Sequence, residues 1–311
     1  MTNICILGGG GFVGRNLASQ LARSGYHVTV PTRQRQRIKD LLVLPGVEVV
    51  EADIHDSATL EQLIADQDTA INLVGILHGS RKAFERAHVE LPVKIMDACQ
   101  VNGVRRFLHM SALGADTHSK SVYQQTKGEG EQRVLSAAKS LDITIFRPSV
   151  IFGPGDSFLN LFADLLKLAP VVPLANGRAL FQPVHVTDVA RAFALAIDDP
   201  ATFGQAYDLC GPQVYSLQEL VRIVADTLGL KRTVIPLNPS LSLLFARLME
   251  LKPGKKLMTR DNHYAMQVDN VCTEGFPARF GQPAPLEANL GYLFGDGIKG
   301  RYDLFREAAG R

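Results

Sequence analysis

The fold is decided by the stretch Ile4-Cys5-Ile6-Leu7-Gly8-Gly9-Gly10-Gly11-Phe12-Val13-Gly14 at the start of the chain. Its apolar run predicts a buried strand, and apolar residues recur after the glycines at helical spacing as far as Leu21. A strand, a glycine loop and a helix in this order are typical of dinucleotide-binding turns, where the backbone approaches a pyrophosphate at the amino terminus of the helix. A merely flexible turn is the alternative. The residues expected to contact the cofactor here are Gly8, Gly10, Gly11, Phe12, Val13 and Gly14.

The first 150 residues continue this alternation of short strands and helices. Further strands are predicted at residues 27–30, 47–50, 70–74, 106–110 and 143–146, with helices at 81–102 and 122–138. Such alternation implies right-handed βαβ units and a parallel sheet. We therefore predict an α/β protein with a Rossmann-type doubly wound parallel sheet in residues 1–150. A smaller, partly interleaved domain is expected in residues 151–311, with about 181–210 returning to the Rossmann sheet.

Composition excludes several functional classes. Of the 311 residues, 46% are hydrophobic and 21% charged, which is typical of a globular protein and not of a disordered or collagen-like chain. The 33 basic and 31 acidic residues leave a net charge of +2, so no global field favours nucleic acid. No stretch of about 18 apolar residues predicts a membrane span, and the first residues do not resemble a signal peptide. We expect a cytoplasmic protein that does not bind nucleic acid.

Cysteine and histidine follow no metal-binding pattern. The four cysteines, Cys5, Cys99, Cys210 and Cys272, lie far apart without a CxxC pair, and the 8 histidines form no HExxH motif. We therefore expect no metal site. Because structural disulfides are rare in cytosolic proteins, we expect four reduced thiols.

The ends of the later strands offer further cofactor contacts. After the second strand, Arg33 is the first residue of a basic run, and no carboxylate follows until Asp40. Arginine can bind a phosphate through two hydrogen bonds, so we predict that Arg33 contacts a 2′-phosphate and that NADP(H) is preferred, with NAD(H) possible. The positions where the third and fourth strands would contact adenine and the sugars are Asp53, Ile54, Val74 and Gly75.

A second motif carries acid–base chemistry. Tyr123 and Lys127 are four residues apart and therefore share one face of a predicted helix. The lysine ammonium would stabilise the phenolate, so the tyrosine could exchange a proton with a substrate hydroxyl or carbonyl. With Ser111, which follows the fifth strand, these residues form the candidate catalytic set.

These motifs, taken in order, resemble the extended branch of the short-chain dehydrogenase/reductase superfamily. Other matching runs are Arg147-Pro148-Ser149, Phe152-Gly153-Pro154-Gly155 and His185-Val186-Thr187-Asp188-Val189. Residues 122–131 and the run Asp269-Asn270-Val271 are similar to an atypical subgroup, which contains the nucleotide-binding accessory subunit of mitochondrial complex I and its bacterial relatives. The resemblance implies an epimerase/dehydratase-like fold and NAD(P) binding. It places Tyr123 and Lys127 at the nicotinamide ribose, and Pro148 among the cofactor-binding residues.

Two features depart from the active extended members. His88 stands where they have asparagine, and Ser111 precedes Tyr123 by only 12 residues. Two hypotheses follow. The first is an NADP(H)-dependent oxidoreductase or epimerase-like enzyme that acts on an unidentified, quinone-type small molecule. The second is a non-catalytic NADPH-binding scaffold, sensor or assembly factor of a membrane-associated respiratory or quinone redox complex.

Residues 241–256 combine an apolar stretch, which includes Leu241, Leu244 and Leu248, with a basic tail at 252–256. An amphipathic helix of this kind can lie on a membrane surface or against a protein complex. We prefer an ordinary core helix with a solvated end. The alternative keeps open a peripheral position at the inner face of a membrane.

Overall fold

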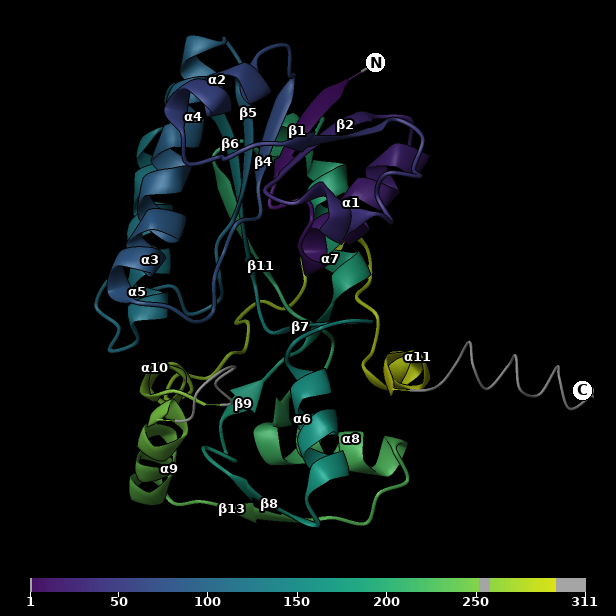
Figure 1. Cartoon of the computed structure of the whole chain (residues 1–311), viewed down its shortest axis with the longest axis vertical. Helices are drawn as coiled ribbons and strands as arrows, with labels where there is room; N and C mark the ends of the chain where they lie inside the picture. The colour runs from purple at the N-terminus through teal and green to yellow at the C-terminus, as the bar shows by residue number, and fades with distance from the viewer. Residues whose placement is uncertain (1, 252–257, 295–311) are drawn as a thin grey trace, which may run out of the picture. The chain divides into compact units, whose positions relative to one another are not determined.

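The computed structural model describes residues 2–251 and 258–294 and divides the chain into two compact units (Figure 1). Unit 1 comprises Met1–Pro148, Val186–Leu209 and Glu274–Gln282. Unit 2 comprises Ser149–His185, Cys210–Thr273 and Pro283–Arg311. Unit 1 thus includes Val186–Leu209, whereas residues 181–185 and 210 belong to unit 2. It also includes Glu274–Gln282, which the sequence places in the smaller domain.

Unit 1 contains a seven-stranded parallel sheet, so the predicted Rossmann-type α/β class is confirmed. Its strands are β1 (Asn3–Leu7), β2 (His27–Thr32), β3 (Val47–Glu51), β4 (Thr69–Asn72), β5 (Arg106–Met110), β6 (Asp142–Pro148) and β11 (Gln205–Leu209). Their spatial order is β11-β6-β5-β4-β1-β2-β3. The chain changes direction across the sheet between β1 and β4. In open α/β sheets, ligands bind at such a switch point, beyond the carboxyl ends of the strands.

Helices cover both faces of this sheet (Figure 1). One face carries α2 (Ser57–Ile64), α3 (Arg81–Glu85), α4 (Leu91–Val101) and α5 (Val122–Ser136). The other carries α1 (Phe12–Arg23), which packs against α7 (Val186–Ala196). Ile95, Phe107 and Ile143 are at most 1% exposed between α4 and the sheet. Each such side chain contributes roughly 1.5–3 kcal/mol through burial.

The helix predicted at 81–102 is interrupted. A π-helical turn, Arg86–Glu90, separates α3 from α4, and Pro92 is the second residue of α4. Proline has no backbone N–H, so Pro92 cannot donate the usual hydrogen bond to the carbonyl of His88 four residues earlier. The Leu91 N–H donates to the Arg86 carbonyl, five residues back. The local sequence therefore widens the helix at His88.

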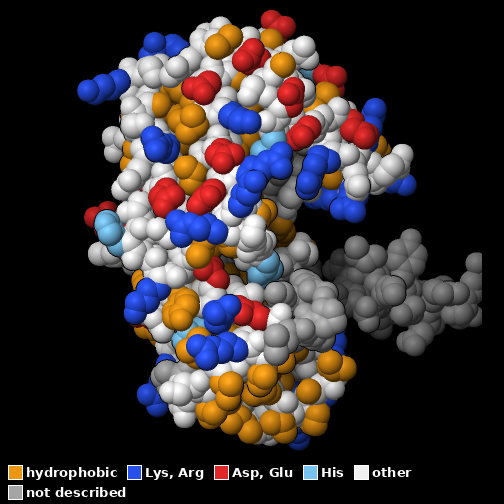
Figure 2. Space-filling view, turned by 60° about the vertical axis from the view of Figure 1, so that its left-hand side comes forward, with side chains coloured by type: hydrophobic (Ala, Val, Ile, Leu, Met, Phe, Trp, Pro, Cys, Tyr) orange, Lys and Arg blue, Asp and Glu red, His pale blue; other side chains and the backbone are white. Residues whose placement is uncertain are grey.

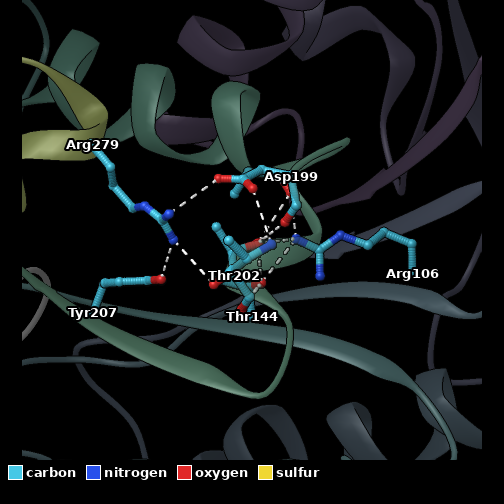
Figure 3. Close-up of polar contacts among 8 residues, drawn as sticks. Arg106, Thr144, Asp199, Thr202, Tyr207 and Arg279 are labelled. Carbon is cyan, nitrogen blue, oxygen red and sulfur yellow. Dashed lines mark hydrogen bonds and ion pairs between the residues drawn. The ribbon is translucent and has the colours of Figure 1, made fainter.

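The buried guanidinium of Arg106 links β5 to the start of β6 and to the residues that follow α7 (Figure 3). It donates to the carbonyl oxygens of Ile197 at 3.0 Å and Asp142 at 2.6 Å. It also donates to the hydroxyls of Thr144 at 2.8 Å and Thr202 at 3.0 Å. Burial lowers the pKa of Arg106 to about 10. These hydrogen bonds offset the free-energy cost of burying the guanidinium charge inside unit 1.

Unit 2 is built from short strands and helices around its own apolar core. Its strands are β7 (Ile151–Phe152), β8 (Val171–Leu174), β9 (Leu180–Phe181), β10 (Val184–His185), β12 (Tyr215–Ser216) and β13 (Thr233–Pro236). Its helices are α6 (Leu159–Leu168), α8 (Leu217–Thr227), α9 (Pro239–Leu251), α10 (Arg260–Ala265) and α11 (Leu290–Phe294). Helix α8 begins with a capping box formed by Ser216 and Glu219.

Helix α9 presents its larger side chains to solvent. Ser242 and Ala246 are fully buried, whereas Leu241, Leu244 and Leu248 are 47%, 52% and 54% exposed. Figure 2 shows hydrophobic side chains gathered over this part of unit 2. The interpretation as an ordinary core helix is therefore wrong for the three leucines. The basic residues 252–256 lie outside the described residues.

The prediction of four reduced thiols is wrong for two of them. Cys210 and Cys272 form a disulfide within unit 2, with their Cα atoms 6.0 Å apart. Cys5 and Cys99 are free and buried, and burial raises the pKa of each thiol to about 12. The sequence separation of 62 residues hid the pairing, because distant cysteines carry no signal of contact.

The disulfide should stabilise the fold measurably. Closing a loop of 62 residues reduces the conformational entropy of the unfolded chain. In the chain-entropy model this stabilises the folded state by about 4 kcal/mol. We expect the Cys210→Ser/Cys272→Ser double variant to lose stability up to this amount in urea unfolding. A thiol reductant should lower the wild type to the same level and leave the variant unchanged. Identical unfolding curves for the wild type with and without reductant would contradict the pairing.

Candidate functional site

The glycine loop lies close to the end of β4 and to helix α1 because two glycines, Gly8 and Gly14, have no Cβ. Gly8 adopts a φ of +85°, and a Cβ there would lie 2.9 Å from the carbonyl carbon of Leu73. A Cβ on Gly14 would lie 2.4 Å from the carbonyl oxygen of Gly8. Helix α1 begins directly after Gly11, and no side chain caps it. Its first amides can therefore bind an anion, which the helix dipole also favours.

Arg15, on helix α1, stabilises this loop through hydrogen bonds. Its guanidinium donates to the carbonyl oxygens of Gly10 at 2.9 Å and Arg37 at 2.6 Å, and it pairs with Asp40 at 2.6 Å. Arg15 thus joins the glycine loop to the basic run after β2. It also occupies Asp40, the first carboxylate of that run. The sequence analysis missed Arg15, which carries no motif of its own.

Arg33 follows β2 and is exposed. No carboxylate in the described part of the chain forms an ion pair with it. The Ala52 amide donates to the Thr32 carbonyl at 2.9 Å, so the backbone just before Asp53 runs beside that just before Arg33. Asp53 is exposed and accepts a hydrogen bond from the His55 amide at 3.0 Å, while Ile54 packs against the core.

The ends of β4 and β5 bring the other candidates together. The Lys127 ammonium donates to the carbonyl oxygen of Met110 at 2.9 Å. A Cβ on Gly75 would lie 3.6 Å from the Lys127 Nζ. Ser111 comes directly after Met110, and its buried hydroxyl has no hydrogen-bond partner among the described residues. Burial lowers the pKa of Lys127 to about 8, against the opposing effect of Glu131.

Tyr123 lies one helical turn before Lys127 on α5 and is partly buried. Its ring meets the His88 ring edge-on, with centroids 5.5 Å apart, and the Phe84 ring at 6.3 Å. Pro148 ends β6, where its carbonyl oxygen accepts a hydrogen bond from the Leu113 amide at 2.9 Å.

The predicted residues form two groups in unit 1. The first group lies at the switch point, where a Cβ on Gly8 would lie 3.0 Å from the Val74 amide nitrogen. Gly75 follows Val74 and lies beside Lys127, so this group comprises Gly8, Val74, Gly75 and Lys127. Arg33 and the Asp53 loop lie at the ends of β2 and β3, on the other side of β1. Such a spread of groups is suited to an extended dinucleotide.

A buried polar pair supports the first group. The Asn72 side-chain oxygen accepts a hydrogen bond from the Val74 amide at 3.1 Å, and its amide nitrogen lies 3.1 Å from His109 Nδ1. Burial lowers the pKa of His109 well below its usual range, with a smaller effect from Lys127. The sequence signal of this pair is a polar residue near the end of each strand, because Asn72 is the last residue of β4 and His109 the next-to-last residue of β5.

The described residues contain no cluster of three or more histidine, cysteine or acidic side chains that could hold a metal ion. No helix among residues 2–251 and 258–294 is long and apolar enough to cross a membrane.

Comparison with known proteins identifies relatives. The sequence profile of the NAD dependent epimerase/dehydratase family matches residues 4–210. An Arabidopsis thaliana protein, NADH dehydrogenase (ubiquinone) 1 alpha subcomplex subunit 9, mitochondrial, is 34% identical over 229 residues, which are 71% of this chain and 56% of that protein. The ceramide reductase of Caulobacter vibrioides is 29% identical over 236 residues, which are 75% of this chain and 73% of the reductase. This chain thus spans little more than half the length of the Arabidopsis protein.

Solved structures agree on the fold. The UDP-glucose 4-epimerase of Thermotoga maritima superposes with a TM-score of 0.72 at 17% identity, covering 93% of this chain and 96% of the epimerase. Identity at this level supports the shared architecture alone.

The close approach at Gly14 predicts that a larger residue there lowers the stability of the fold. In Gly14→Ala, the added Cβ meets the backbone of residues 8 and 9, which cannot move aside freely. We expect a loss of about 1–3 kcal/mol in urea unfolding, as for other overpacked sites. Gly291→Ala is the control, because nothing lies within 4 Å of a Cβ there. Equal stability of the two variants would contradict the packing.

Proposed function

Because this chain belongs to the NAD-dependent epimerase/dehydratase family, we propose that it binds NADP(H) and exchanges hydride with a small-molecule substrate as an oxidoreductase or epimerase-like enzyme. The Ser111 hydroxyl carries the proposal. It is buried without a partner among the described residues, next to the carbonyl that holds Lys127. Leaving such a group unsatisfied costs about 1–3 kcal/mol, which a bound ligand would recover.

Each member of the catalytic set has a role that its surroundings support. A bound nicotinamide would supply the hydride chemistry. Tyr123 gives a proton to the substrate oxygen, or takes one from it. The Lys127 ammonium stabilises the phenolate and is held in place by the Met110 carbonyl. Ser111 donates a hydrogen bond to the same substrate oxygen and orients it.

The preference for NADP(H) rests on Arg33. Its guanidinium is exposed at the end of β2 and forms no ion pair with the described carboxylates. The nearest acidic residue of the run, Asp40, is paired with Arg15. Arg33 is therefore available to bind a 2′-phosphate through charge-assisted hydrogen bonds. NAD(H) lacks this phosphate and would bind more weakly.

Replacing Arg33 should remove this preference. We expect Arg33→Glu to weaken NADPH binding about 10- to 100-fold, because a charge-assisted hydrogen bond contributes roughly 1.5–3 kcal/mol. NADH affinity should change little, and calorimetric titration measures both. Arg37→Glu makes the same charge change four residues later and should keep the wild-type preference. Wild-type protein that binds NADH as tightly as NADPH would contradict the proposal.

The second candidate function is a non-catalytic NADPH-binding scaffold or assembly factor of a membrane-associated redox complex. The observation that favours it is the exposed face of α9, with Leu241, Leu244 and Leu248 one or two helical turns apart. Exposed apolar patches of this kind are typical of contacts with a protein partner or a membrane surface. The Arabidopsis relative, named as a subunit of NADH dehydrogenase, makes a peripheral position at such a complex the natural alternative.

Substitution of Tyr123 distinguishes the two functions. If the protein is an enzyme, Tyr123→Phe should lower NADPH-dependent reduction of quinones or carbonyl compounds about 10²- to 10⁴-fold, because an acid–base group is lost. NADPH affinity should stay within a few-fold of wild type. Turnover that survives the substitution would rule out the acid–base role. NADPH binding without turnover of any tested substrate would favour the scaffold.

A further inference from the structure

His88 is buried among the elements that form the nicotinamide end of the proposed site. It is 2% exposed and lies in the π-helical turn between α3 and α4. Its ring meets the ring of Tyr123 edge-on at 5.5 Å and lies tilted against that of Phe84 at 5.5 Å. A Cβ on Gly75 would lie 3.9 Å from the His88 Nε2.

Both ring nitrogens of His88 are used in hydrogen bonds. The Ile76 amide donates to Nε2 at 3.1 Å, so this nitrogen carries no proton. Nδ1 lies 3.0 Å from the Thr126 hydroxyl, which itself donates to the Val122 carbonyl at 2.8 Å. A hydroxyl has one proton to give, so His88 must donate from Nδ1. The hydrogen bonds therefore assign a single neutral tautomer.

The surroundings keep this imidazole neutral. Burial, and to a lesser degree the charge of Lys127, lowers the pKa of His88 to about 3. With one nitrogen accepting and the other donating inside the protein, the ring has no proton left for a substrate. The position therefore does not carry a proton relay in this chain.

Packing also holds the backbone of His88 in place. A Cβ on Gly130 would lie closer than 2 Å to the His88 carbonyl oxygen, so only glycine on α5 allows this approach. Pro92 gives that carbonyl no hydrogen bond from within its own helix. The π-helical turn thus packs directly against α5 at His88, and His88 cannot shift without moving both.

We propose that His88 is a positioning residue for the nicotinamide half of the bound cofactor. It fixes the Gly75–Ile76 backbone against α5 and limits the orientation of the Tyr123 ring. The Ile76 hydrogen bond holds the loop that follows β4, and the Thr126 hydrogen bond holds the turn that precedes Lys127. The proposal rests on the proposed binding of NADPH. It assigns to His88 a mechanical role in place of proton transfer.

Two substitutions separate the two hydrogen bonds. The side-chain amide of glutamine reaches the place of Nε2, so His88→Gln can still accept from the Ile76 amide. The shorter amide in His88→Asn reaches the place of Nδ1 and can donate only to Thr126. Thr126→Val removes the second hydrogen bond and leaves the first. Each variant is titrated with NADPH and with adenosine 2′,5′-bisphosphate, which has no nicotinamide.

We expect His88→Asn to bind NADPH about tenfold more weakly, which corresponds to one hydrogen bond. His88→Gln and Thr126→Val keep the hydrogen bond from the Ile76 amide, which holds the loop after β4, so they should bind NADPH within about threefold of wild type. All three variants should bind adenosine 2′,5′-bisphosphate like the wild type. Equal losses for both ligands, or the same NADPH affinity in the two His88 variants, would overturn the positioning role. Wild-type protein that binds neither ligand would instead refute the proposed function.

A measurement on the wild-type protein tests the proposal even if the variants fail to fold. The Ile76 amide donates to a buried nitrogen, so its hydrogen exchange should be slow in the protein without cofactor. Rapid exchange of this amide would show that His88 does not hold the loop, and would overturn the proposal without any substitution.

Discussion

The architecture of unit 1 depends on the absence of two Cβ atoms. Gly8 and Gly14 let the turn after β1 press against the end of β4 and against its own helix, with built Cβ positions 2.9 Å and 2.4 Å from backbone atoms. No other residue type fits either position. The approach places Gly8 beside the Val74 amide, and α1 begins uncapped four residues after Gly8. The contacts proposed for the cofactor phosphates and sugars follow from this one constraint.

A second close approach sets the chemistry of the site. Gly130 lets α5 touch the π-helical turn, which puts Lys127 and His88 in the same buried space. The shared burial lowers the pKa of both groups, so that His88 is neutral and Lys127 is close to losing its proton near neutral pH. A lysine of this kind responds strongly to a phenolate or a ligand placed beside it. The close approach at Gly130 therefore determines both the packing around His88 and Lys127 and the pKa shifts of the two groups.

Much of the fold was predictable from local patterns. The apolar runs at residues 4–7 and 106–110 and the glycines between strand and helix specify βαβ units without reference to distant residues, and the family they suggested is confirmed. Long-range features were not predictable. The Cys210–Cys272 disulfide joins residues whose spacing is uninformative, and the recruitment of Glu274–Gln282 into unit 1 depends on packing late in the chain.

The candidate site divides in the same way. Tyr123 and Lys127 are found by spacing because a helix aligns residues four apart. Thr126 and Asn72 act through hydrogen bonds to residues 38 and 37 positions away, and no local pattern reveals such partners. The leucines of α9 were misread, because apolar residues at helical spacing fit a buried face and an exposed one equally well. Only the structure shows that Ser242 and Ala246 occupy the buried face.

The central claim is that one dinucleotide lies across the carboxyl ends of the strands of unit 1. Amide hydrogen exchange with and without saturating NADPH tests it directly. The account predicts slower exchange at residues 9–13, where the first turn of α1 would hold the pyrophosphate, and at residues 74–76 after β4. Unchanged exchange in both segments under saturating NADPH would contradict it.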